Sequence, residues 1–196
     1  MKYYKLTDYY PRDVFFSFSD KNSLEKSDLE KCKKQQMPLN ERVIYTVDKF
    51  DKYLDEYDIL PTIGASLISY KLKKIIKELN INDCQFIPVI IEDTSTNEVN
   101  ENFFALNILN CIDCLDEEKS EIKPLMKSFP NGPIKVISLF FKDNELEGHS
   151  IVRMLESKST IVVNSIFLEI CKESKIKGVQ FIEEGNQLSP SFVKMG

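Results

Sequence analysis

The stretch 84–109 limits the fold more than any other part of the chain. Two runs rich in β-branched and aromatic residues, "CQFIPVII" at 84–91 and "FFALNIL" at 103–109, flank the polar segment "TSTNEVNEN" at 94–102. Such runs are typical of strands, and a polar segment between two of them is typical of a turn. We therefore expect a β-hairpin over residues 84–109.

Two segments repeat their apolar residues at helical spacing, 70–80 and 165–174. We predict that both are helices and that they face the core through Leu72, Ile75, Ile76, Leu79, Phe167, Leu168, Ile170 and Cys171. Residues 2–6, 42–47, 134–141, 150–155 and 179–183 have the composition of strands. The segment 48–58 carries a third apolar stripe at helical spacing, formed by Phe50, Tyr53, Leu54 and Tyr57. The charged segment 24–36 is compatible with a peripheral helix.

Residues 67–87 align without a gap to residues 162–182, with identities that include Ile75/Ile170 and Phe86/Phe181. Both segments describe a helix, a turn and a strand. A duplicated unit explains the match, and so does the general likeness of any amphipathic helix followed by a strand. Gly178 and Asp83 stand where the chain must turn from helix to strand.

These elements predict an α+β fold, in which a mixed, largely antiparallel sheet packs against two helices from the repeated helix-turn-strand unit. We expect the strands near 84–91, 103–109, 134–141 and 179–183 to build that sheet. For the domain organisation we expect a peripheral N-terminal segment at 1–59, a core at 60–183 and a loose tail at 184–196.

Composition narrows the class of protein. Of 196 residues, 42% are hydrophobic and 13 are Phe, which is enough for a proper core. The net charge of −5 argues against a general nucleic-acid binder, which needs a basic face, and is compatible with a basic partner. We find no secretory leader and no membrane-length apolar run, and the five cysteines are odd in number. We therefore expect a cytoplasmic protein without a disulfide framework.

Cys111 and Cys114 form a C-x-x-C pair, but no second such pair exists and His149 is the only histidine. A structural zinc site needs four ligands, and a redox pair needs a lowered thiol pKa. The acidic residues that follow the pair would raise a thiol pKa. We therefore interpret both cysteines as small residues at a strand end, with no metal and no cofactor bound.

Other chemical motifs are weak. The carboxylates from Asp113 to Glu121 lack a calcium-loop pattern, and "LDEEKSEI" is more simply a helical turn capped by Asp116. No motif fixes a nucleophile or carboxylate beside His149 or Arg153, and no glycine-rich phosphate loop is present. We therefore expect no catalytic residues.

Several segments together resemble one family: "MKYYKL", "LISYKLKKIIKEL", "CQFIPVII", "FFALNILNCIDCLDEEKS" and "IVRMLESKSTIVVNSIFLEICKESKIKGVQF". The order is similar to that of family eleven of the bacterial polymorphic-toxin immunity proteins, and the likeness covers residues 60–183. Residues that match the family's pattern are Ser69, Asn107, Leu115, Asp116, Ser120, Arg153, Gly178 and Phe181. Val152 departs from it, because the family has Phe before the arginine.

The resemblance implies a cytosolic antidote, without enzymatic activity, that binds the toxin domain of a secreted effector and protects the producer and its kin. An acidic antidote suits a toxin with a basic surface. Two acidic patches are our candidates for the contact: the first patch is Asp51, Asp55, Glu56 and Asp58, and the second patch is Asp113, Asp116, Glu117, Glu118 and Glu121. For either patch alone, a merely solvated acidic face is the competing interpretation. A small enzyme with an unrecognised pocket, or a scaffold with an exposed apolar patch, are the alternative functions.

Overall fold

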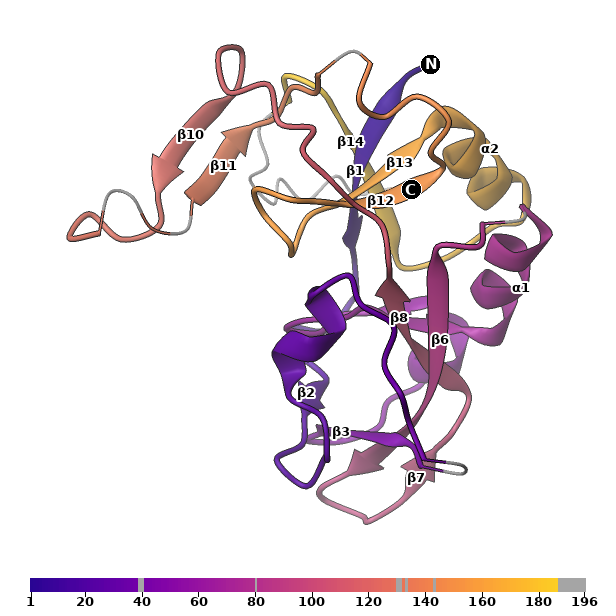
Figure 1. The fold of residues 1–196 in the computed structure, drawn as a ribbon. Helices are drawn as coiled ribbons and strands as arrows, with labels where there is room; N and C mark the ends of the chain where they lie inside the picture. The colour runs from indigo at the N-terminus through magenta and orange to yellow at the C-terminus, as the bar shows by residue number, and fades with distance from the viewer. Residues whose placement is uncertain (39–40, 80, 130–131, 133, 143, 187–196) are drawn as a thin grey trace.

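The computed structural model describes residues 1–38, 41–79, 81–129, 132, 134–142 and 144–186. This part of the chain forms two lobes, each built on a sheet, and a β-hairpin that stands off to one side (Figure 1). The elements are mostly strands, with two α-helices among the described residues, so the fold is α+β.

The seven-stranded sheet forms the lower lobe in Figure 1 and runs in the order β2-β3-β6-β8-β5-β4, with β7 paired to β6. Its strands are β2 (Ser17–Phe18), β3 (Val43–Val47), β4 (Ile59–Leu60), β5 (Leu67–Ser69), β6 (Cys84–Asp93), β7 (Val99–Asn100) and β8 (Phe103–Ile108). Strands β6 and β8 are antiparallel, with Cys84 opposite Ile108 and Pro88 opposite Phe104. The predicted hairpin over residues 84–109 is therefore confirmed.

The five-stranded sheet forms the upper lobe and runs in the order β14-β1-β13-β12-β9. Its strands are β1 (Tyr3–Asp8), β9 (Cys111–Ile112), β12 (Ile151–Met154), β13 (Ile161–Asn164) and β14 (Val179–Glu183). Between them, β10 (Glu121–Pro124) and β11 (Ile134–Ser138) pair only with each other. Among the described pairings, β3 with β6 and β9 with β12 are parallel and the others are antiparallel, so the sheets are mixed.

Helices α1 (Tyr70–Glu78) and α2 (Ser165–Glu173) each follow a strand directly. The last residue of that strand caps the first turn of the helix with its side chain. Ser69 Oγ accepts the Leu72 N–H at 3.2 Å, and Asn164 Oδ1 accepts the Phe167 N–H at 2.9 Å. These bonds satisfy amide groups that lack a partner inside the helix. The capping residues therefore set where both helices start.

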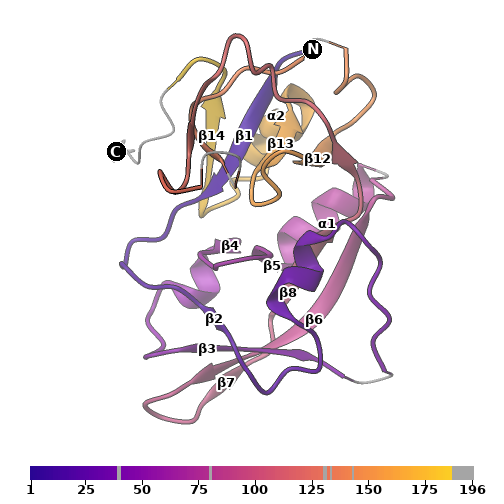
Figure 2. The same cartoon turned by 60° about the vertical axis from the view of Figure 1, so that its left-hand side comes forward.

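The two helices pack through most of the apolar residues that the sequence predicts, although Ile170 is only partly buried. Leu72, Ile76 and Phe167 are almost fully buried. They belong to one core cluster that takes residues from both sheets, including Tyr4 and Ile161 above and Leu106 below. This cluster joins the two lobes, with α1 and α2 stacked beside it (Figures 1 and 2). Further clusters fill the lower lobe and the root of the β10–β11 hairpin.

The strands that we expected to build one sheet belong to three different sheets in the described structure. Strands β6 and β8 lie in the lower sheet, β14 lies in the upper sheet, and β11 belongs to the separate hairpin. Nor do residues 1–59 form a peripheral segment, since β1 lies between β13 and β14 and β3 pairs with β6. Whether the two helix-turn-strand units are a duplication stays a prediction.

Two helical interpretations are also corrected, and a third is confirmed. The segment 48–58 forms only the short 3-10 helix η2 (Leu54–Glu56), because Asp51 Oδ1 accepts the Tyr53 N–H at 2.8 Å and so stabilises a local turn instead of a helix. The segment 24–36 contains only the 3-10 helix η1 (Lys26–Glu30). The capped turn expected after Leu115 is confirmed: Asp116 Oδ1 accepts the Lys119 N–H at 3.1 Å, as a cap does, and the Asp116 carbonyl accepts the Ser120 N–H at 2.9 Å, as in a helical turn.

The start of the predicted tail is tied to the upper lobe. Glu184 Oε1 accepts the Phe141 N–H at 2.7 Å, and the Gly185 N–H donates to the Leu139 carbonyl at 2.9 Å. Residues 187–196 lie outside the described part of the chain. In the part that is described, no helix combines the length and the apolar composition of a bilayer span.

Candidate partner-binding site

The first acidic patch lies in the lower lobe, and its carboxylates are bonded within the protein. Asp51 accepts the Tyr10 hydroxyl at 2.8 Å and pairs with Arg12 at 3.1 Å. Burial raises the pKa of Tyr10, and the Asp51 carboxylate raises it further. Asp51 therefore anchors the N-terminal segment and offers little charge to a partner.

Asp58 is the most deeply buried member of the first patch, with 6% of its surface exposed. Its carboxylate accepts the Ser69 hydroxyl at 2.6 Å and the Lys177 N–H at 2.9 Å, and Lys71 Nζ lies 3.7 Å away. Lys177 follows α2 in the upper lobe, whereas Asp58 and Ser69 belong to the lower lobe. Asp58 therefore joins the two lobes and is not a free contact residue.

Asp55 and Glu56 border a cleft of about 700 Å³ beside Asp58. Asp55 accepts the side-chain amides of Asn100 and Asn102, and Glu56 lies 3.5 Å from Lys177 Nζ. Lysines line the same cleft, so its charge is mixed rather than acidic. His149 is not among the lining residues; its Nδ1 lies 3.0 Å from the Asn110 side chain.

The second acidic patch lies where the β10–β11 hairpin leaves the upper lobe, and part of it is also paired. Asp113 forms an ion pair with Lys142, which lowers the pKa of Asp113. Asp116 lies 3.0 Å from Lys119 Nζ, and this contact lowers the pKa of Asp116. These two carboxylates are therefore ionised at neutral pH, and each has a lysine beside it in the free protein.

Glu117 and Glu118 differ from the other predicted residues. Both are exposed in the turn after Asp116, and the described structure gives neither of them an ion pair. Glu121 is also exposed, with Lys123 Nζ at 3.1 Å. Since exposed ion pairs are weak, Glu121 still presents a carboxylate to a partner. Free negative charge in the predicted patches is therefore concentrated at the turn 117–121.

Glu156 belongs to the second patch in space, although it is distant in sequence. Its Oε1 accepts the Leu115 N–H at 2.8 Å, and burial raises the pKa of its carboxyl group. A hydrogen bond to Asp113 raises that pKa further. Sequence reasoning missed Glu156 because only the turn between β12 and β13 brings it beside the Asp113–Leu115 segment.

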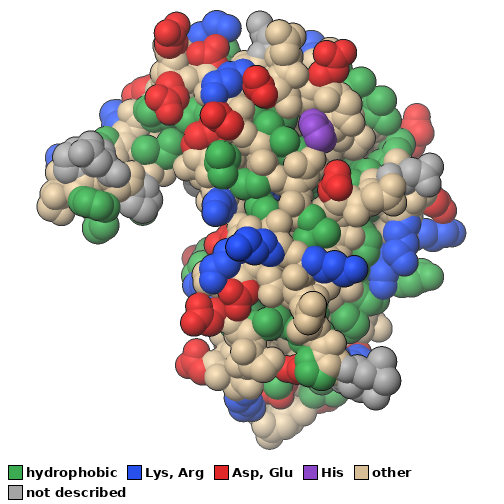
Figure 3. Space-filling model, in the orientation of Figure 1, with side chains coloured by type: hydrophobic (Ala, Val, Ile, Leu, Met, Phe, Trp, Pro, Cys, Tyr) green, Lys and Arg blue, Asp and Glu red, His purple; other side chains and the backbone are tan. Residues whose placement is uncertain are grey.

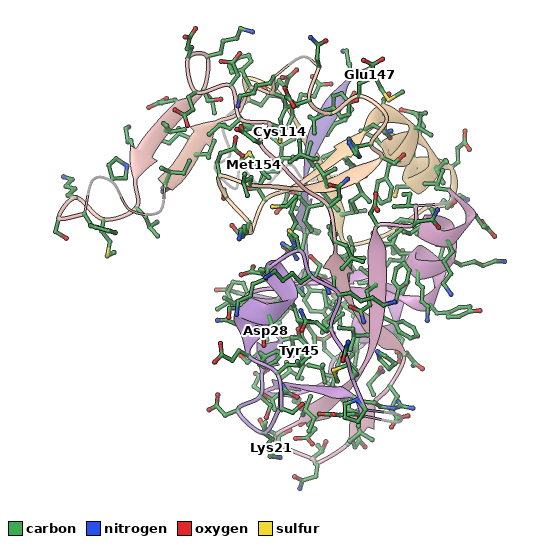
Figure 4. All side chains as sticks on the ribbon, viewed as in Figure 1. Lys21, Asp28, Tyr45, Cys114, Glu147 and Met154 are labelled. Carbon is green, nitrogen blue, oxygen red and sulfur yellow. The ribbon has the colours of Figure 1, made fainter. Side chains whose placement is uncertain are left out.

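The C-x-x-C pair lies at the root of the same hairpin. Cys114 is fully buried and packs with Met154, and Figure 4 shows these two residues together at this point. Burial raises the pKa of the Cys114 thiol to about 12, with Glu156 and Asp113 adding to the effect. The thiol is therefore protonated and packs as a small apolar residue. Among the described residues, no three His, Cys, Asp or Glu side chains are placed to hold a metal ion.

The motif residues Arg153 and Asn107 hold one segment of the lower lobe in place. Arg153 is fully buried, and its guanidinium donates to the carbonyl groups of Lys158 and Leu29. Asn107, which is also fully buried, donates to the Lys33 carbonyl at 2.8 Å. Both side chains satisfy backbone groups around η1 and are therefore unavailable to a substrate or a partner.

Two further motif residues act at the joint between the lobes. Ser69 caps α1 and donates to Asp58. Gly178 has φ of +86°, and a Cβ there would lie 2.5 Å from the Ile59 carbonyl oxygen. Arg153, Asn107, Ser69 and Gly178, four of the residues behind the resemblance, thus hold the frame of the molecule together.

Comparison with known families agrees with this frame. The model of the Imm11 immunity protein family matches residues 17–186. The chain therefore belongs to the Imm11 immunity protein family, and the match includes most of the N-terminal segment that the resemblance left out. No curated protein matches the chain.

Proposed function

We propose that the chain is a cytoplasmic antidote of a bacterial polymorphic-toxin system, which neutralises the toxin domain of a secreted effector by forming a direct complex with it. The observation that carries this proposal is the family match over residues 17–186. In this proposal the chain acts by binding the toxin domain and does not catalyse a reaction. The two acidic patches remain the proposed contact residues, and the turn 117–121 is the stronger candidate.

The exposed negative charge of the turn 117–121 supports the proposal that the partner has a basic surface. Glu117 and Glu118 are exposed at a turn that projects beside the hairpin, and the whole chain has a net charge of −5. Carboxylates of this kind stay hydrated in the free protein and attract a basic partner over roughly 10 Å at moderate salt. Such attraction accelerates association, which suits an antidote that must reach its toxin before damage is done.

Association kinetics test this proposal. The probe is the purified toxin domain encoded beside the gene of this chain. We expect the association rate constant to fall steeply with added salt while the dissociation rate constant changes less. Exchanging Glu117→Lys together with Glu118→Lys lowers the association rate constant about tenfold or more at low salt.

Glu169→Lys with Glu173→Lys on α2 is the matched control, because it makes the same change of charge at exposed glutamates of another surface. We expect this control to keep the association rate constant within about threefold of the wild-type value, because it changes only the overall charge of the protein. Equal effects of the two double variants would remove turn 117–121 from the contact surface. The absence of any complex with the wild-type chain would contradict the antidote role itself.

A further inference from the structure

The β10–β11 hairpin carries an apolar tip that the rest of the protein does not cover. Leu125 is 60% exposed, Met126 is 52% exposed and Phe129 is 54% exposed. Figure 1 shows the hairpin standing off the upper lobe, and Figure 3 shows apolar side chains at its far end. Three large apolar side chains within five residues of the chain are thus exposed, and exposed apolar side chains that gather in one place are typical of a protein-contact site.

The tip has a defined shape. The Phe129 N–H donates to the Met126 carbonyl at 3.0 Å, and the Gly132 N–H donates to the Phe129 carbonyl at 3.0 Å. A Cβ at Gly132 would lie 2.1 Å from the Phe129 ring, so this ring lies directly across the glycine. The backbone N–H and carbonyl of Phe129 are thus both hydrogen-bonded within the hairpin, which lowers the entropy lost when a partner holds this residue.

Charge around the tip is opposite in sign to that of the whole chain. Residues 122–142 contain no Asp or Glu, although the chain has 31 of them, and they carry Lys123, Lys127 and Lys135 next to the apolar residues. All three lysines are exposed. The carboxylates of the second patch precede this stretch, at the base of the hairpin. The hairpin is therefore acidic at its base and basic at its tip.

The edges of the hairpin are protected against pairing with another strand. Pro124 ends β10, and Lys123 and Lys135 stand opposite each other in the register of the two strands. Proline and lysine on an exposed strand oppose the addition of a further strand. A partner is therefore met by the side chains of the tip and not by extension of the sheet.

We propose that the tip residues Leu125, Met126 and Phe129 insert into an apolar groove of the cognate toxin domain whose rim is acidic. Lys123 and Lys127 meet the carboxylates of that rim, while Glu117 and Glu118 at the base face a basic area of the same toxin. This inference rests on the proposed function and names the part of the molecule that performs it. The lysines of one tip repel those of another, which disfavours a second copy of the chain as the occupant.

Matched variants of exposed residues test the inference by titration calorimetry against the purified toxin domain encoded beside this gene. Phe129→Ser is compared with Phe15→Ser, since both side chains are 54% exposed, and Leu125→Ser is compared with Ile63→Ser, since both are 60% exposed. We expect each tip variant to raise Kd at least about tenfold and each control to stay within about twofold. Lys127→Glu raises Kd as well, whereas Lys49→Glu, another exposed lysine, does not.

The outcomes separate this inference from the proposed function. Binding by the wild type, with equal Kd values for tip and control variants, overturns the inserted tip and leaves the antidote role intact. Absence of binding by the wild type overturns both. Sedimentation of the protein alone supplies a further check. A dimer that Phe129→Ser converts to a monomer would show that the tip binds a second copy instead.

Discussion

Replacing Gly178 by alanine tests how the two lobes are joined. The turn between α2 and β14 lies against the segment Tyr57–Ile59, where the Asp58 N–H donates to the Lys177 carbonyl at 2.9 Å. A Cβ at Gly178 would lie 2.5 Å from the Ile59 carbonyl oxygen and 3.0 Å from Tyr57 Cδ1. The Ile59 carbonyl oxygen belongs to the backbone, so it can move away from the added Cβ only if the turn and the segment separate.

The expected loss of stability has two parts. A left-handed backbone costs an L-residue about 1–2 kcal/mol relative to glycine, and φ is +86° at this position. Overpacking against atoms that cannot move aside costs about 1–3 kcal/mol more. We therefore expect Gly178→Ala to lower the free energy of unfolding by roughly 2–5 kcal/mol, which corresponds to a fall in Tm of about 2–4 °C for each kcal/mol.

Gly148→Ala is the control, because Gly148 has φ of +83° and no atom within 4 Å of an added Cβ. Gly148→Ala therefore carries the free-energy cost of the left-handed backbone but no cost of a steric clash. Urea unfolding followed by circular dichroism measures both variants. Gly178→Ala should be less stable than Gly148→Ala by at least about 1 kcal/mol. Equal losses would refute the close contact between turn and segment.

Three further predictions concern the buried carboxylates of Asp58 and Asp93 and the C-x-x-C pair. Asp58→Asn lowers the free energy of unfolding by about 1–3 kcal/mol because it removes the charge that accepts two hydrogen bonds, whereas the exposed Asp55→Asn stays within about 0.5 kcal/mol, as urea unfolding will measure. Asp93 accepts the Phe50 N–H and groups of residues 95 and 96, which holds the pKa of its carboxyl group well below the ordinary 3.8. Its contribution is thus present above about pH 4 and is lost as pH falls toward the folded pKa, so Asp93→Asn should flatten the dependence of unfolding free energy on pH between about pH 4 and pH 2, and an unchanged slope would contradict this. Cys111→Ser with Cys114→Ser should leave toxin neutralisation intact, and protein purified without chelator should contain no stoichiometric zinc or iron; one metal equivalent that disappears in the double variant would overturn this prediction.

Local sequence patterns predicted the elements whose partners are close in the chain. The hairpin of β6 and β8 is confirmed because both strands and their turn lie within one continuous stretch. Helices α1 and α2 are confirmed because capping and apolar spacing are local properties. The strand at residues 2–6 is also confirmed, but its central place is not predictable, since Tyr4 pairs with Val163 and Glu183 at the other end of the chain.

The candidate site was harder to predict for the same reason. The sequence predicts available negative charge at both patches, but several of these carboxylates lie beside cations that are far away in sequence. Asp51 pairs with Arg12, Asp113 with Lys142, and Glu56 lies near Lys177. Glu117 and Glu118 are different because both are exposed and neither forms an ion pair among the described residues. The apolar run 134–141 predicts one strand in the main sheet, whereas β11 ends at Ser138 in the separate hairpin and burial is greatest after it, at Leu139 and Phe141.

Survival of cells that produce the neighbouring toxin domain tests the antidote role most directly. The toxin domain is induced alone, with the wild-type chain, and with a variant that combines Phe129→Ser, Glu117→Lys and Glu118→Lys. We expect the wild-type chain to restore growth and the combined variant, at equal protein level, to protect poorly. Cells that die equally with and without the wild-type chain, although the folded chain is abundant, would contradict the account.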